Sequence, residues 1–556
     1  MRNRFVITVL AIAATCLTIV MTLGIVGVPG SAKRERDSRS GDRTHSTSNR
    51  TDTNPRGAVN VVTYHYDLLR SGQNLQEEIL TPANVNSNQF GKIGFLSVDG
   101  MVDAAPLYVS QLTVANQSHN VVFVVTEHDS VYAFDADTFD QLWHVSVLGS
   151  DETPSDDRNC GQVSPEIGIT STPVIQYEAN NGIMYLVAMS KDHHGKYFQR
   201  LHALDIGRGF EMPGSPATIE ARFPNLRGET VFDPKQYKER ASLLLVDGVV
   251  YTSWASHCDI GDYTGWLIGY NASTLQQTNV LNLTPNGSDG AIWMSGAGPA
   301  ADSGGNIYLL DANGTFDTAL NSKRFPVSGD FGNAFLKLSV SGGNLRVADY
   351  FNMHDTSAES LRDEDLGSGG ALVLPDLKDA SGHTWRLAVG AGKDHRVYVV
   401  NRDSMGKFST ATDNSVYQHI DDALKGGVFG MPAYFKNMVY FGAVDDSLKA
   451  FSIVNARLLP RPISKTLTTF AYPGTTPSVS ADDDLNGIVW AVEARGSESG
   501  VLHAYDAGDL SHELYNSNQA GARDAFSDNK YITPVVANGE VFVGTLTGVA
   551  VFGLLQ

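Results

Sequence analysis

One short strand pattern recurs along this chain and restricts its possible folds more than any other feature. The pattern runs apolar, any residue, apolar, apolar, and most copies continue with Asp, Asn or Ser. The copies are VYAFDADT from Val131, LHALDIGR from Leu201, LIGYNAST from Leu267, FLKLSVSG from Phe335, VYVVNRDS from Val397, LKAFSIVN from Leu448, LHAYDAGD from Leu502 and VAVFGLL from Val549. Successive copies are 47 to 70 residues apart. Such spacing indicates one repeated supersecondary unit, although a chain of 556 residues would ordinarily suggest several domains.

Two further strand-like stretches precede each copy. AAPLYVS and NVVFVVTEHDS precede the first copy, and ITPVVANG and EVFVGTLTG precede the last. The spacing of the copies and the number of strands in each are those of a propeller blade. The last copy lacks its fourth strand, and FGKIGFLSV near Phe90 can supply it. We therefore predict an all-β fold, an eight-bladed β-propeller of four-stranded blades closed by pairing of the two chain ends, because closure leaves no open sheet edge. An open array of β-sandwich units leaves the missing strand unexplained.

The N-terminal region divides into two parts ahead of the propeller. Residues 1–32 hold Arg2 and Arg4, an apolar run over residues 5–28 and a small-residue cleavage site, so they read as a signal peptide or an uncleaved signal anchor. Residues 33–57 are polar and predict a disordered tether, and residues 58–556 form the propeller. Either reading of the leader places the body of the protein outside the cytoplasm, periplasmic or secreted, with a possible membrane anchor.

Charge excludes one class of partner. The formal net charge is −20, from 61 acidic and 41 basic residues. Phosphate repulsion would oppose nucleic-acid binding, so we expect no such partner. The surplus carboxylates can bind hard cations such as Ca²⁺.

The order TPVV-turn-VYVG-turn-VYALDA-turn-LW characterises the pyrroloquinoline quinone (PQQ) repeat family, and the chain resembles this family across roughly residues 90–556. It is distantly similar to the PQQ-dependent alcohol dehydrogenases. The resemblance implies a propeller whose loops hold PQQ and Ca²⁺ on one face.

In blade four, GAIWMSGAGPA resembles the segment that forms the floor beneath the quinone, which implies that Trp293 stacks on the cofactor. The alternative is that Trp293 fills the channel wall. The loop DANG carries Asn313 where the family has a Ca²⁺ ligand, with Asp311 and Asp317 also chemically suitable. An ordinary Asn-Gly turn explains Asn313 equally simply.

Three more positions follow from the same resemblance. SHCDIGDYTGW places Asp259 or Asp262 where the family has a Ca²⁺-binding Glu. RDEDLGSGG places Asp365, with Asp363 in reserve, at the catalytic Asp that binds Ca²⁺ and takes the proton of the alcohol. VGAGKDHR places Lys393 near the reactive quinone carbonyl, where a cation would stabilise developing negative charge.

Cysteine usage gives one further expectation. Cys160 lies in the loop from blade one to blade two, and Cys258 lies in the middle loop of blade three. Both loops open on one face, so a disulfide is expected in an oxidising compartment, with two free thiols as the alternative. The family's adjacent Cys-Cys pair and the Arg that follows it have no match, and no CxxCH motif is present, so no covalent haem is expected.

Two functions remain after this reading. A non-catalytic propeller would bind a protein or glycan partner, as the missing Cys-Cys pair and Arg suggest. A quinoprotein would use PQQ and Ca²⁺ to oxidise a small-molecule alcohol or sugar, as the set formed by Trp293, Asn313, Asp365 and Lys393 suggests. A glycan hydrolase or lyase would need a pair of carboxylates that the sequence does not single out.

Overall fold

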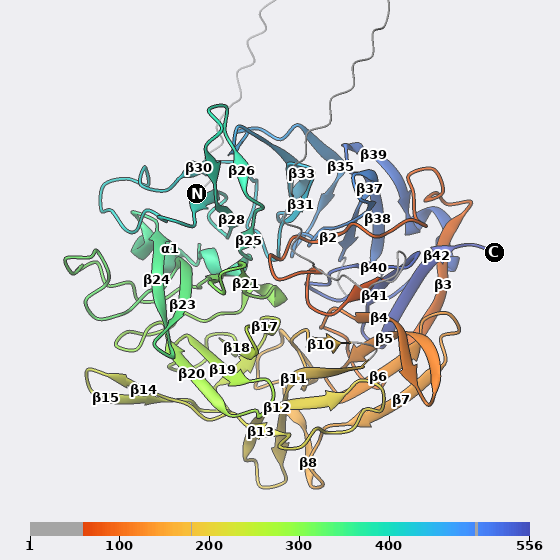
Figure 1. The fold of residues 1–556 in the computed structure, drawn as a ribbon, viewed down its shortest axis with the longest axis horizontal. Helices are drawn as coiled ribbons and strands as arrows, with labels where there is room; N and C mark the ends of the chain where they lie inside the picture. Colours follow the sequence, from red (N-terminus) through yellow and green to blue (C-terminus); the bar gives the residue numbers. More distant parts are fainter. Residues whose placement is uncertain (1–58, 179–180, 495–498) are drawn as a thin grey trace, which may run out of the picture. The chain divides into compact units, whose positions relative to one another are not determined.

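The computed structural model of the chain describes residues 59–556, except 179–180 and 495–498 (Figure 1). The leader expected over residues 1–32 and the tether over 33–57 lie outside the described residues. No helix within the described part of the chain is long and apolar enough to cross a membrane.

Eight antiparallel sheets surround a central channel and form the eight blades predicted from the repeats (Figure 1). From the channel outward, the strands of blades 1 to 4 are β4 (Leu107–Val114), β5 (Gln117–Val125), β6 (Ser130–Asp135) and β7 (Gln141–Ser146); β10 (Val174–Glu178), β11 (Asn181–Asp192), β12 (Tyr197–Asp205) and β13 (Ala217–Thr218); β17 (Leu244–Val246), β18 (Val249–Ser256), β19 (Trp266–Asn271) and β20 (Gln277–Asn282); β21 (Ala300–Ala301), β22 (Ile307–Leu310), β23 (Ala334–Ser341) and β24 (Asn344–Asn352). Those of blades 5 to 8 are β25 (Leu372–Val373), β28 (Leu387–Ala391), β29 (Val397–Asn401) and β30 (Gln418–Ile420); β31 (Ala433–Phe435), β32 (Met438–Phe441), β33 (Asp446–Val454) and β35 (Ser464–Phe470); β36 (Ser478–Asp482), β37 (Leu485–Glu493), β38 (Val501–Asp506) and β39 (Asp509–Asn516); β40 (Val535–Ala537), β41 (Glu540–Gly544), β42 (Gly548–Leu554) and β3 (Phe90–Ser97).

Short elements decorate the ring. They are the strands β1 (Asn60–Val61), β2 (Gln73–Asn74), β8 (Glu152–Asp156), β9 (Glu166–Ile167), β14 (Arg222–Asn225), β15 (Gly228–Val231), β16 (Tyr237–Glu239), β26 (Leu377–Lys378), β27 (Thr384–Trp385) and β34 (Arg457–Leu458), the helix α1 (Thr356–Arg362), and the 3₁₀ turns η1 (Met294–Gly296), η2 (Leu366–Ser368) and η3 (Ser517–Arg523). Among them, β16, α1 and η1 carry or flank the residues of the candidate site.

The ring closes as the repeat count predicts. The outer strand of blade 8 is β3, which pairs antiparallel with β42 from Phe90 opposite Leu554 to Ser97 opposite Gly548. Figure 1 shows β3, in orange, beside β42, in blue. The predicted fold, including closure near Phe90, is confirmed, and the fourth strand of the last blade comes from the other end of the ring.

The repeat pattern has a local physical cause. Every copy forms the third strand of its blade, and in five copies the fifth residue ends that strand at the turn to the fourth: Asp135, Asp205, Asn271, Asn401 and Asp506. In this turn the Oδ1 atom of Asp135 accepts from the N–H of Thr138 at 2.9 Å, and Asn271 accepts from Thr274 at 3.0 Å. A short side-chain acceptor that bonds its own backbone two or three residues on stabilises such a turn, which explains why Asp and Asn recur there.

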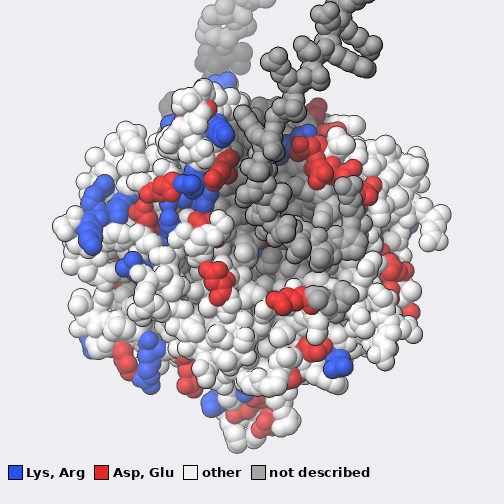
Figure 2. All heavy atoms as spheres, in the orientation of Figure 1, with Lys and Arg blue, Asp and Glu red and all other residues white. Residues whose placement is uncertain are grey.

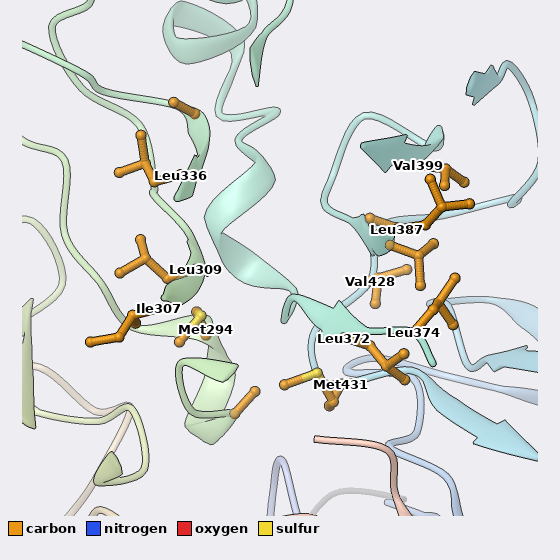
Figure 3. Close-up of a cluster of buried hydrophobic side chains, with 14 of the residues drawn as sticks. Met294, Ile307, Leu309, Leu336, Leu372, Leu374, Leu387, Val399, Val428 and Met431 are labelled. Atoms are coloured by element: carbon orange, nitrogen blue, oxygen red, sulfur yellow. The ribbon is translucent and has the colours of Figure 1, made fainter. Parts of the chain in front are cut away.

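Apolar side chains between blades form the core. Figure 3 shows one part of it, where Leu309 and Leu336 of blade 4 and Leu372 and Leu387 of blade 5 lie on the two sides of the connecting segment. All four are fully buried. Packing between neighbouring sheets therefore holds each blade against the next.

A segment at the start of the described chain fills one end of the channel; we call residues 59–74 the plug. It pairs with the innermost strand of blade 1 through β1 and with that of blade 7 through β2. Individual hydrogen bonds reach the remaining blades. Val62 accepts from Ile175 of blade 2, Leu68 from Ala301 of blade 4, Leu69 from Val373 of blade 5 and Ser71 from Tyr434 of blade 6. Arg70 donates to Leu243 beside blade 3, and Tyr66 accepts from Val536 of blade 8. The plug thus contacts all eight blades, which the repeat pattern did not predict.

Arg70 lies at the centre of the plug and is fully buried. Its guanidinium donates to the carbonyl oxygens of Tyr64 at 2.7 Å, Leu243 at 3.0 Å and Pro299 at 3.0 Å, and to the Thr63 hydroxyl at 2.6 Å. Burial lowers the pKa of Arg70 to about 10, so the group stays charged at neutral pH. The charge is solvated by peptide dipoles from the plug and from blades 3 and 4.

Replacing Arg70 by Met should lower the free energy of unfolding by about 3 kcal/mol or more, because at least three buried acceptors would lose their donor. Urea unfolding at neutral pH measures the loss. The matched control is Arg227→Met, which removes an exposed guanidinium and should change stability by less than about 0.5 kcal/mol. Equal stability of the two variants would show that the plug does not support the ring.

Candidate functional site

A cavity of about 410 Å³ opens on the face of the ring where the middle loops and the blade-to-blade loops gather. It is lined by Cys160, Gln162, Val163, Lys238, Arg240, Ala255, Ser256, Cys258, Asp259, Tyr263, Ala291, Trp293, Ala312, Asn313, Asp363, Asp365, Lys393, Phe429, Tyr472 and Tyr531. Every residue singled out in our sequence analysis as a first choice therefore lies on one cavity. Of the reserves, Asp363 also lines it, whereas Asp262, Asp311 and Asp317 do not.

Aromatic rings form one wall. Trp293 meets Phe429 at 6.0 Å and Tyr531 at 6.1 Å between ring centroids, both edge to face. The Tyr531 hydroxyl lies 2.5 Å from the hydroxyl of Tyr472, whose side chain is half exposed at the mouth. The wall offers flat apolar surface and hydroxyl groups to a ligand.

A left-handed turn directs Trp293 into this cavity. Met294 and Ser295 have φ values of 39° and 52°, a conformation that costs energy for residues with a side chain. The Ser295 hydroxyl donates to the carbonyl of Ser368 at 2.7 Å, which ties the turn to η2. Strain of this kind persists only where surrounding contacts hold it, and it is common at binding sites.

Lys393 connects the carboxylates of the loop from blade 4 to blade 5. Its ammonium nitrogen lies 2.6 Å from an oxygen of Asp363 and 2.6 Å from one of Asp365. Asn313 donates to the same oxygen of Asp363 at 2.7 Å. Gly392 makes the approach of the two loops possible, because a Cβ there would collide with the carbonyl of Asp365.

Asp365 and Lys393 each shift the pKa of the other. Burial raises the pKa of Asp365 above its ordinary value, and the charge of Lys393 opposes that rise. Burial works to lower the pKa of Lys393, but the carboxylates of Asp365 and Asp363 raise it overall. Asp365 is thus a buried carboxylate whose affinity for a proton depends on one neighbouring cation.

Two buried cations lie on another wall, and we did not predict them from the sequence. Lys238 follows the start of β16, and Arg240 lies one residue after its end. Burial, reinforced by the charge of Arg240, lowers the pKa of Lys238 to about 8. The Arg240 guanidinium stacks over Tyr531 at 5.2 Å and lies 3.8 Å from Asp103, while its Nη1 atom donates to no group among the described residues. These cations provide positive charge for an anionic ligand.

Oxygen donors for a metal ion are incomplete. The Oδ1 atom of Asn313 is buried and accepts no hydrogen bond from any described residue, so it is available as a ligand. Asp365 contributes a buried carboxylate. Asp259, in contrast, already accepts from Ser256 at 2.9 Å and from Tyr263 at 2.6 Å. The set fits a hard cation through Asn313 and Asp365, with Asp259 at the rim, and the predicted ligand roles stay predictions.

Asp311 lies behind this wall. Its side chain is fully buried, and neither carboxylate oxygen bonds to a donor in the described part of the chain. Burial raises its pKa strongly, and the charge of Asp365 adds to the rise. A protonated Asp311 would limit the negative charge next to Asp365.

Cys160 and Cys258 form a disulfide at the edge of the cavity, with their Cα atoms 5.6 Å apart. The bond joins the loop from blade 1 to blade 2 with the middle loop of blade 3, across blade 2. The pairing expected from the loop positions is present, and it links two loops that line the cavity.

Comparison with known proteins bears on the fold alone. No protein-family model and no curated protein matches the chain. Among solved structures, a quinohemoprotein alcohol dehydrogenase from Comamonas testosteroni is similar with a TM-score of 0.58 and 12% identity, over 89% of this chain and 80% of that one. The quinohemoprotein alcohol dehydrogenase ADHIIG from Pseudomonas putida HK5 is similar with a TM-score of 0.58 and 13% identity, over the same shares. The chain therefore has the propeller fold of these dehydrogenases.

Removing the disulfide with the double substitution Cys160→Ser and Cys258→Ser should cost about 2–5 kcal/mol of unfolding free energy, because the bond closes a loop of 98 residues. Urea unfolding of this variant and of the oxidised parent gives the difference. Peptide mapping under non-reducing conditions checks the bond itself. Recovery of both cysteines as free thiols would contradict the pairing.

Proposed function

We propose that the cavity binds PQQ together with a hard divalent cation and that the protein is a dehydrogenase acting on an alcohol or sugar. One observation carries the proposal: a flat aromatic wall, two buried cations and the Asp365–Lys393 pair face the same 410 Å³ space. A planar, negatively charged cofactor beside a proton acceptor matches all three features.

The chain's own residues would divide the work of binding. Trp293 supplies an indole face for the planar ring system, and Phe429 lies edge to face with Trp293 beside it. Lys238 and Arg240 provide partners for carboxylates of the cofactor, and Arg240 retains an unused donor for this purpose within the described structure. Lys238 and Arg240 would take the place of the family's Arg that follows the Cys-Cys pair and has no match in this sequence.

Asn313 and Asp365 would hold the cation through side-chain oxygens. The bound quinone would supply the two-electron acceptor for the alcohol carbon. Asp365, buried and beside Lys393, would take the hydroxyl proton of the substrate as general base. Lys393 would keep that carboxylate ionised and would place positive charge near developing negative charge on the quinone.

An extracytoplasmic location is part of this proposal. Disulfides such as that between Cys160 and Cys258 persist in oxidising compartments. The apolar run over residues 5–28 of the sequence is consistent with export.

A non-catalytic role has one specific observation in its favour. Asp259 is engaged with Ser256 and Tyr263, so blade 3 offers a weaker ligand for a cation than the family resemblance implies. In that case the aromatic wall of Trp293, Tyr472 and Tyr531 would bind a glycan or a protein segment by stacking.

Titration of the purified protein with PQQ and Ca²⁺ separates the two functions. We expect saturable binding with quenching of tryptophan fluorescence, and loss of most quenching in Trp293→Ala. Trp385→Ala, on the hairpin between the first two strands of blade 5 and outside the cavity lining, is the matched control, and its fluorescence should be quenched as in the parent. Absence of saturable binding at micromolar PQQ would reject the quinoprotein and leave the glycan or protein ligand.

The acid limb of the profile of kcat/KM against pH tests the role of Asp365. A general base must be ionised, so kcat/KM should rise with pH through the raised pKa of Asp365. Lys393→Met should move this limb to higher pH, because the cation that lowers the pKa is gone, whereas Lys393→Arg should keep it close to the parent. Asp365→Asn should retain cofactor binding and lose about 10²–10⁴-fold in rate. Asp363→Asn tests whether Asp363, the second candidate for the general base, has this role instead. A limb that stays fixed in Lys393→Met would place the base elsewhere.

A further inference from the structure

A second pocket, of about 450 Å³, lies beside blade 5, where its lining residue Asp394 directly follows Lys393 of the cavity in the sequence. Figure 2 shows a mixed group of basic and acidic side chains in the region of α1 and β30 of Figure 1. The pocket is lined by His354, Asp394, His395, Arg396, Ala411, Thr412, Asp413, Asn414, His419, Asp421 and Asp422. None of these residues belongs to the cavity described above.

We propose that His354, Asp355 and Asp413 bind a divalent first-row transition metal ion such as Zn²⁺ at the edge of this pocket. One donor atom from each of the three lies within 4.8 Å of the other two, and this is the one such group of His, Cys, Asp and Glu that the described residues contain. An imidazole nitrogen with two carboxylate oxygens is a donor set typical of such ions, and three protein ligands leave positions open for water from the pocket.

The spacing of the donors suits one ion. His354 Nδ1 lies 2.9 Å from Asp413 Oδ2 and 3.6 Å from Asp355 Oδ1. Donors bonded at about 2.0–2.2 Å to one ion are about 3.0–3.5 Å apart, so small side-chain shifts would complete the geometry. Asp413 is buried, and its other oxygen accepts from the backbone N–H of His354 at 2.7 Å, which orients the carboxylate before any ion binds.

Asp355 provides a separate observation. Its Oδ1 atom is buried and receives no hydrogen bond from any residue in the described part of the chain. Its only partners are ion pairs, with Arg396 Nη1 at 3.5 Å and His354 Nδ1 at 3.6 Å among the described residues, and a metal ion would give this buried oxygen a closer one. The oxygen faces His354, the group from which an ion would also take a bond.

The neighbouring charges favour a cation. Arg396 lies 3.5 Å from Asp355, but it also donates to Glu359 at 3.0 Å and lies 3.6 Å from Asp421. Asp394 and Asp422 add carboxylates to the pocket, and His395 and His419 add imidazoles. His354 Nδ1 lies within hydrogen-bond distance of Asp413 Oδ2; a neutral imidazole would bind the ion through Nδ1 with its proton on Nε2, which would place the ion between the two groups.

The ion would cross-link two long connections. His354 and Asp355 begin the loop from blade 4 to blade 5, and Asp413 belongs to the loop between β29 and β30. Asp365 lies ten residues beyond Asp355 on the first loop, after α1. A metal at the pocket would therefore immobilise the loop that carries a carboxylate of the cavity.

The test uses the full chain after removal of metal by a chelator. Titration with Zn²⁺, and with Co²⁺ followed by its visible absorption, should show one site. His354→Gln and Asp413→Asn should each weaken binding by roughly 100-fold, since each removes one ligand. His419→Gln, in the same pocket, and Asp365→Asn, in the cavity, should bind like the parent, which separates this site from any cation bound with a cofactor.

Two outcomes would overturn the proposal. The parent protein could bind neither ion at micromolar concentration, in which case His354 and Asp413 form an ordinary ion pair. Alternatively, His354→Gln and Asp413→Asn could bind as tightly as His419→Gln, which would place the metal elsewhere. The titration of the parent decides the first outcome without any variant, so a variant that fails to fold does not weaken the test.

Discussion

The buried guanidinium of Arg70 is the interaction on which the rest of the ring depends. Blades in a propeller pack against their two neighbours, so no blade-to-blade contact holds all eight at once. The plug does so because its backbone and side chains bond to the innermost strand, or to the residue beside it, in every blade. Arg70 joins the plug to blades 3 and 4, because its guanidinium donates hydrogen bonds to carbonyl groups there that would otherwise lack donors.

Strand pairing and ring closure could be predicted because they follow from periodic patterns. In five of the eight copies the fifth residue, such as Asp135 or Asn271, ends the third strand at a turn that needs a short acceptor side chain, so the chemistry of this turn is visible in the sequence. The plug has no such pattern. Its contacts use backbone carbonyls of Val62, Leu68 and Leu69, and any residue type could supply them.

The candidate site divides in the same way. Trp293, Asn313, Asp365 and Lys393 could be chosen because they occupy positions in repeated loops that the resemblance marks, and the fold brings them to one cavity. Lys238 and Arg240 could not be chosen, because Lys238 lies on β16, a short strand outside the four-stranded pattern, and Arg240 directly follows that strand. Their burial is also unusual for cations, so the sequence YKERAS reads as an exposed segment until the fold is known.

One short segment joins the cavity to the plug. Gly296 approaches Arg240 of the cavity, and Gly298, two residues further along the same segment, approaches Arg70 of the plug. In a chamber open on one side only, a large planar ligand would have to settle on the inner wall before a small one arrives, and it would then lie behind the small one. Exchange of the inner molecule would be slow in such a chamber, and repeated cycles of the outer one could take place without its loss.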